Sequence, residues 1–194
     1  YVDQDGNEID KKYQIAGQDY PSEKTGGLGG EGNALDFETT GPDFKGYIYS
    51  SRDSIKGKYY KDPADPDNLD VVKYSYFKKV TAKEPTNKNV YFPVIFDANG
   101  GEFKSDTVTQ KTVYVYFDGN DATVEKVTFK EVKDEFEKAY SNPTKDGFDF
   151  KEWQNAKTGG KKPADDHEIQ FKGWDWEGDP DNGYVPETFY AHYG

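Results

Sequence analysis

Residues 143–153 read Pro-Thr-Lys-Asp-Gly-Phe-Asp-Phe-Lys-Glu-Trp, a turn that leads into a strand ending on a tryptophan. The proline fixes one backbone dihedral and Gly147 permits a positive one, so the stretch begins with the residues of a tight turn. Phe148, Phe150 and Trp153 then supply three bulky rings to bury. We therefore predict a hairpin whose aromatic residues anchor a hydrophobic core.

The chain has 194 residues, which suggests two small domains, and its main apolar material is aromatic, with 16 Tyr, 13 Phe and 3 Trp. Aromatic residues favour strands over helices, and their rings can build modest cores in a chain that is poor in aliphatic residues. The sequence contains no Cys and no Met, which excludes a disulfide framework, a thiol nucleophile and a cysteine-based metal site.

The charge pattern argues against two classes of partner. The formal net charge is −12, and the basic residues, lysines apart from Arg52, are dispersed among 37 acids, so no basic stripe is available to neutralise phosphates. No stretch approaches the roughly 20 apolar residues that span a bilayer. We expect neither nucleic-acid binding nor membrane insertion.

A polar, proline-bearing stretch at residues 81–89 separates two aromatic strand runs and predicts a linker. The linker divides the chain into one module at residues 1–86 and another at residues 87–194. Within the first module, residues 1–9 contain an Asp-Gly turn between apolar residues and predict a hairpin, and residues 71–77 alternate as a strand does.

In the second module, alternation predicts strands at residues 90–97, 111–118 and 124–129. Apolar residues then recur at the spacing of one amphipathic helix from Phe129 to Tyr140. These patterns predict an α+β, β-rich fold in which a single helix crosses a mixed sheet.

Candidate catalytic and metal-binding residues are sparse. The two histidines, His167 and His192, have neither a serine elbow nor zinc-type spacing around them. Acidic runs at residues 62–70 and 175–181 lack the register of an EF-hand loop, so we interpret them as solvated loops. The sequence predicts a protein that is not an enzyme and needs no cofactor or metal.

Aromatic and polar residues cluster between positions 174 and 184. Aromatic faces stack on the C–H surfaces of sugars, and carboxylates and amides accept hydroxyl protons, so this cluster is a candidate glycan site. Packing of the same rings into a core is the alternative. Of the two tryptophans, Trp176 is the one that we expect to be exposed. The candidate site residues are Trp174, Trp176, Tyr184, Asp179, Asp181 and Asn182.

Three segments of the second module, residues 94–101, 143–153 and 188–193, carry a family resemblance. In that order they resemble the Listeria–Bacteroides repeat, also called the internalin B-repeat, a small β-grasp module of bacterial surface proteins. One departure is Glu152, which stands where the family usually has a glycine before the tryptophan.

A second departure is an insertion of about 25 residues, roughly residues 161–185, before the closing strand. Within it, Phe-Lys-Gly-Trp at residues 171–174 repeats the usual Phe-x-Gly-Trp form of the family. Either Trp153 or Trp174 is therefore the candidate core tryptophan.

The first module is similar to the mucin-binding-protein (MucBP) module over about its first 80 residues. The matching pieces are the Tyr-Val-Asp-x-Asp-Gly-Asn start, residues 17–20, the Gly46-Tyr47 pair and a Val-x-Tyr-x-Tyr strand that begins at Val72. A glycine-rich insertion at residues 25–33 departs from the family pattern.

Together the two resemblances imply tandem, ubiquitin-like β-grasp modules with a non-catalytic role in adhesion. We expect a monomeric fragment of a larger Gram-positive surface protein, extracellular and associated with the cell wall. The implied partner is host mucin, another glycoprotein or glycan, or matrix protein. The alternative is a passive stalk, or spacer repeat, that holds a distal adhesive domain away from the wall.

Overall fold

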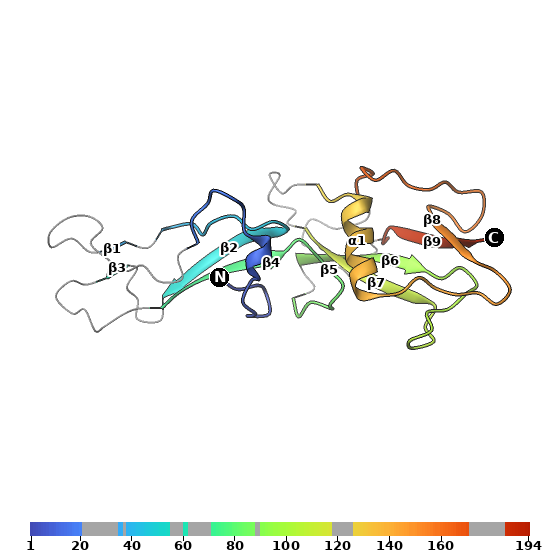
Figure 1. The fold of residues 1–194 in the computed structure, drawn as a ribbon, viewed down its shortest axis with the longest axis horizontal. Helices are drawn as coiled ribbons and strands as arrows, with labels where there is room; N and C mark the ends of the chain where they lie inside the picture. The colour runs from blue at the N-terminus through green and yellow to red at the C-terminus, as the bar shows by residue number, and fades with distance from the viewer. Residues whose placement is uncertain are drawn as a thin grey trace. The chain divides into compact units, whose positions relative to one another are not determined.

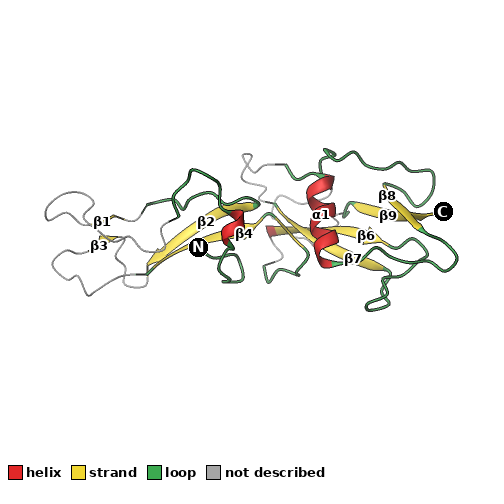
Figure 2. Ribbon diagram, viewed as in Figure 1, coloured by secondary structure: helices red, strands yellow, loops and turns green. Residues whose placement is uncertain are grey.

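The computed structural model describes residues 1–20, 35–36, 38–54, 60–61, 71–87, 90–117, 126–170 and 185–194. Within these residues strands outnumber the single α-helix, so the fold is β-rich and of the α+β class, as predicted (Figures 1 and 2). The chain divides into two compact units, Tyr1–Lys78 and Lys79–Gly194.

The first unit is built on an antiparallel pair of strands, β2 (Tyr47–Ser54) and β4 (Val72–Lys78). Val2 lies beside β4 in the parallel direction. Its amide donates to the carbonyl oxygen of Tyr74, and its carbonyl oxygen accepts from the amide of Tyr76, each at 2.9 Å. β4 confirms the strand predicted at residues 71–77.

Residues 1–9 form the predicted hairpin. Val2 and Glu8 make an antiparallel bridge, and Gly6 takes the positive φ of 81° that the turn requires. The remaining elements of this unit are a 3₁₀ helix, η1 (Lys11–Tyr13), and a separate two-stranded pair of β1 (Leu35–Asp36) with β3 (Tyr60–Lys61).

Aromatic side chains make the core of the first unit and also hold an irregular segment, residues 38–43, against it. Tyr74 and Tyr76 donate hydrogen bonds of 2.5 and 2.6 Å to the carbonyl oxygens of Glu38 and Pro42. The same segment also accepts from Tyr20, Tyr49 and Arg52. The many tyrosines thus supply both the rings of the core and donors for a segment without regular secondary structure.

The second unit contains a five-stranded sheet in the order β5-β7-β6-β9-β8. Neighbouring strands are antiparallel, except that β6 and β9 run parallel at the centre of the sheet. The strands are β5 (Val80–Thr81), β6 (Tyr91–Asp97), β7 (Gln110–Tyr116), β8 (Phe150–Gln154) and β9 (Thr188–Tyr193). Because β5 pairs with β7, the division between the units lies before residues 81–89.

The helix α1 (Phe129–Ala139) packs on one face of this sheet (Figure 1). Its bounds agree with the helix that the apolar spacing predicted from Phe129 to Tyr140. In its described part, the strand predicted at residues 124–129 is reduced to one antiparallel bridge of Thr128 with Glu168, because Phe129 begins the helix.

Thr128 is the N-cap, because its hydroxyl oxygen accepts from the Glu131 amide at 3.3 Å. The Thr-x-x-Glu sequence is typical of a helix start. The alternation of apolar residues up to Phe129 favoured a strand, so this signal for the start of a helix was missed.

The core of the second unit lies between α1 and the sheet. Phe136 of the helix stacks on Phe96 of β6 with ring centroids 4.4 Å apart, and Trp153 meets both rings edge-on. Trp153 is only 4% exposed, and its indole N–H has no hydrogen-bond partner within the described residues. Trp153 is therefore a core tryptophan, while Trp174 lies outside the described residues.

The prediction that Phe148 anchors this core is wrong, because its side chain is 54% exposed. Gly147, with φ of 78°, turns the chain between Lys145 and Phe148 and directs this ring away from the sheet. The Lys145 ammonium group lies 5.0 Å from the centre of the exposed ring. Phe150 is half-buried and packs against the core, 5.3 Å from Trp153 between ring centres.

Candidate functional site

The predicted glycan cluster lies outside the described residues, so its geometry stays a prediction. The residues concerned are Trp174, Trp176, Tyr184, Asp179, Asp181 and Asn182. The described residues on either side of this gap in the sequence are Gln170 and Val185. Both of them line the same pocket of the second unit. The two described residues that flank the predicted site in the sequence therefore line one pocket.

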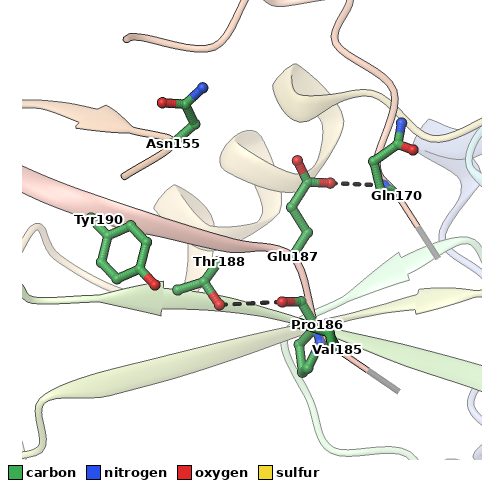
Figure 3. A pocket seen from close by; sticks show the side chains of 7 residues that line it. All are labelled: Asn155, Gln170, Val185, Pro186, Glu187, Thr188 and Tyr190. Carbon is green, nitrogen blue, oxygen red and sulfur yellow. Dashed lines mark hydrogen bonds between the residues drawn. The ribbon is translucent and has the colours of Figure 1, made fainter. Parts of the chain in front are cut away.

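The pocket has a volume of about 340 Å³ and lies beside the first half of β9 (Figure 3). Among the described residues, its lining combines one aromatic ring, two amides, one aliphatic hydroxyl, one carboxylate and two apolar side chains. Its lining residues are Asn155, Gln170, Val185, Pro186, Glu187, Thr188 and Tyr190. This mixture of an apolar surface with a few polar groups is typical of small-ligand sites.

Strand alternation places the aromatic ring of the pocket. Phe189 and Ala191 are fully buried and point toward α1, so Thr188 and Tyr190 point to the opposite face of the sheet. Tyr190 is half-buried there, and the Lys157 ammonium group lies 6.0 Å from the centre of its ring. Part of the Tyr190 ring is consequently available for contact from solvent.

Glu187 has a structural role at the rim of the pocket. One carboxylate oxygen lies 2.5 Å from Nε2 of His167. The other accepts from the amide of Gln170 at 2.7 Å (Figure 3). These two contacts attach the segment at residues 167–170 to the start of β9. Because each carboxylate oxygen is held by one of these contacts, Glu187 fixes the shape of the pocket.

The amide side chains keep hydrogen-bonding capacity for a ligand. The Asn155 side-chain oxygen accepts from the Lys161 amide at 2.9 Å, which positions the side chain and leaves its NH₂ group as a donor. The Gln170 NH₂ group donates to the Glu168 carbonyl at 3.0 Å, which leaves its side-chain oxygen as an acceptor. The two amides of the pocket thus offer an NH₂ donor group and an acceptor oxygen in addition to the Tyr190 ring.

The two histidines contact different partners. His192 Nε2 is 2.8 Å from the Ala156 carbonyl, and His167 pairs with Glu187. Within the described residues, no three His, Asp or Glu side chains come together as a metal site. The acidic runs at residues 62–70 and 175–181 lie outside those residues. In the same part of the chain, no helix has the length and apolar character to cross a membrane.

Sequence reasoning missed the residues of the pocket. Tyr190 lies in the segment 188–193, whose alternation was available as a signal of an outward-facing ring. Asn155 and Gln170 carried no such signal, because they reach the pocket through loop conformation and the pairing of β8 with β9.

Comparison with known proteins finds no matching family model, no matching curated protein and no matching solved structure. Function is therefore inferred from the fold and from the chemistry of the described residues.

Proposed function

We propose that this chain consists of two β-grasp modules of a non-catalytic bacterial surface adhesin, and that the second module binds glycans. The strand order of the second unit supports the β-grasp assignment. Two antiparallel pairs, β6 with β7 and β8 with β9, are joined by α1 along the chain and meet through the parallel β6–β9 pair. A helix between two such pairs is the arrangement that a β-grasp requires.

Support for the same assignment in the first unit is less extensive. A hairpin comes first in the chain, and its Val2 pairs in parallel with β4. A parallel pairing between the first and last strands is again what the β-grasp requires. The glycine-rich insertion at residues 25–33, which departs from the MucBP pattern, lies outside the described part of the chain.

The observation that carries the glycan proposal is the pocket beside β9. A half-buried tyrosine ring, a donor amide and an acceptor amide are groups with which proteins hold a sugar, by stacking and by hydrogen bonds to hydroxyl groups. Gln170 and Val185 also bracket the predicted cluster of Trp174 and Trp176 in the sequence. Pocket and cluster together would form one glycan-binding surface.

On this proposal the natural ligands are host mucin glycans, or another glycoprotein or matrix protein. The chain would act as a monomeric part of a larger, Gram-positive, extracellular protein associated with the cell wall. Its net charge of −12 favours neutral sugars over sulfated or sialylated ones, because like charges repel.

The test is binding of the full chain to arrayed glycans and to immobilised mucin, followed by titration of any sugar that binds. Tyr190→Ala should weaken binding about tenfold or more, which corresponds to about 1.4 kcal/mol. Tyr114→Ala is a matched control, because Tyr114 is a half-buried tyrosine on the same sheet face but outside the pocket. Equal weakening by both variants would contradict a site at Tyr190.

Wild-type protein that binds neither mucin nor any arrayed glycan at millimolar concentration would contradict the adhesin proposal. The alternative function, a passive stalk or spacer repeat, would then remain. That alternative requires no pocket.

A further inference from the structure

We propose that the second unit also bears mechanical load, and that the parallel β6–β9 pair is the clamp that resists it. This function requires no ligand and is independent of the proposed glycan binding. The pair is defined by its register, in which Ile95 lies opposite Thr188 and Phe96 lies opposite Phe189. The amide of Ile95 also donates to the Glu187 carbonyl at 3.0 Å.

The direction of the two strands decides how tension acts on them. Because β6 and β9 are parallel, the start of β6 and the end of β9 lie at opposite ends of the pair. A pulling force that is applied to the chain before Tyr91 and after Tyr193 therefore acts along the strands. The inter-strand hydrogen bonds run across this direction, so they must break together. In an antiparallel hairpin the same tension would open the bonds one after another.

The position of the pair in the fold protects these hydrogen bonds from water. β6 and β9 are both interior strands, since β7 and β8 flank them on the two sides. On the α1 face, Phe96 and Phe189 are fully buried with ring centroids 5.7 Å apart. Hydrogen bonds are stronger in such a low-dielectric environment than in water. Sliding the strands would also break the contact between these two rings.

The first unit contains a smaller version of the same arrangement. Val2 lies parallel to β4, and its two hydrogen bonds to Tyr74 and Tyr76 lie across the direction of the strands. Tension between Tyr1 and Lys78 would load this single bridge in shear. Because the bridge is shorter than the β6–β9 pair, we expect the first unit to yield at the lower force.

Force spectroscopy on the full chain tests the clamp. The sequence has no cysteine, so introduced cysteines give unambiguous attachment points. Thr86→Cys with Gly194→Cys loads the β6–β9 pair in shear, because the two exposed positions lie before β6 and after β9. Thr86→Cys with Val185→Cys attaches both handles at the same end, so the pair is peeled apart; Val185 is 63% exposed.

We expect the second unit to unfold at a severalfold higher force in the shear geometry than in the peeling geometry, at the same loading rate. Forced unfolding is governed by the unfolding rate along the pulled direction, so the two geometries compare one fold with itself. Melting curves of both cysteine variants should match the wild type, and Pro186→Cys is a second attachment if Val185→Cys lowers the melting temperature. Equal forces in the two geometries would overturn the proposal.

Discussion

Gly41 lies directly against the ring of Tyr76, whose hydroxyl group donates a 2.6 Å hydrogen bond to the carbonyl oxygen of Pro42. A Cβ atom at position 41 would overlap the Tyr76 hydroxyl and press on the Tyr74 ring. The segment at residues 38–43 therefore reaches the sheet only because glycine occupies this position.

Gly41→Ala should destabilise the first unit by about 1–3 kcal/mol, since overpacking forces neighbouring groups to shift. Urea unfolding followed by tyrosine fluorescence measures the loss. The combination of Gly41→Ala with Tyr76→Phe should cost less than the sum of the two single changes, because the phenylalanine lacks the overlapping oxygen. Strict additivity would show that the contact between residues 41 and 76 does not limit packing.

The tyrosines of the first unit predict a loss of stability at high pH. Burial raises the pKa of Tyr1 to about 12 and also raises the pKa of Tyr74 and Tyr76. In the unfolded chain a tyrosine ionises near pH ~10, so the unfolded state gives up these protons first. The stabilisation by the neutral rings is therefore fully present below about pH 10 and is lost as the pH rises toward 12.

Tyrosinate absorbance and circular dichroism, recorded together against pH, test this prediction. Part of the absorbance change should be delayed and should coincide with a loss of structure. Tyr1→Phe should shift that step to higher pH, because one buried phenol no longer ionises. Ionisation of all 16 tyrosines in one step near pH ~10, with the circular dichroism unchanged, would contradict it.

Two phenylalanines of the second unit should respond in opposite ways to truncation. Phe136→Ala should cost about 3 to 5 kcal/mol, because the ring is fully buried between Phe96 and Trp153. Phe148→Ala should stay within about 0.5 kcal/mol, because that ring is mostly exposed. Chemical denaturation of both variants measures the difference. A loss above about 2 kcal/mol for Phe148→Ala would place its ring in the core.

These cases show which features a single sequence could predict. Alternation through Phe92, Val94 and Phe96 identified β6 and its buried face, because side-chain period is a local property. Apolar spacing identified α1 for the same reason. The exposure of Phe148 could not be read this way, because the positive φ of Gly147 sets the direction of the ring after the turn.

The sequence pattern also could not predict which strands pair when they are distant in the chain. The parallel contact of Ile95 with Thr188 joins segments that are distant in the chain, and no local signal specifies the partner or direction of an interior strand. The pocket depends on that register and on loops that bring Asn155 and Gln170 to β9. For this reason the sequence pointed to Trp174 and Trp176 on composition alone and did not identify Tyr190.

Trp176 and Tyr190 together provide the test of where glycans bind. Trp176→Ala should leave the free energy of unfolding within about 0.5 kcal/mol of the wild type, as expected for an exposed ring. If pocket and cluster form one surface, Trp176→Ala and Tyr190→Ala should each abolish or strongly weaken mucin binding, and both losses should appear on the same glycans. Calorimetric titration of one bound sugar against the wild type and the two variants is the measurement. Loss in Trp176→Ala alone would restrict the site to the predicted cluster, and loss in Tyr190→Ala alone would restrict it to the pocket beside β9.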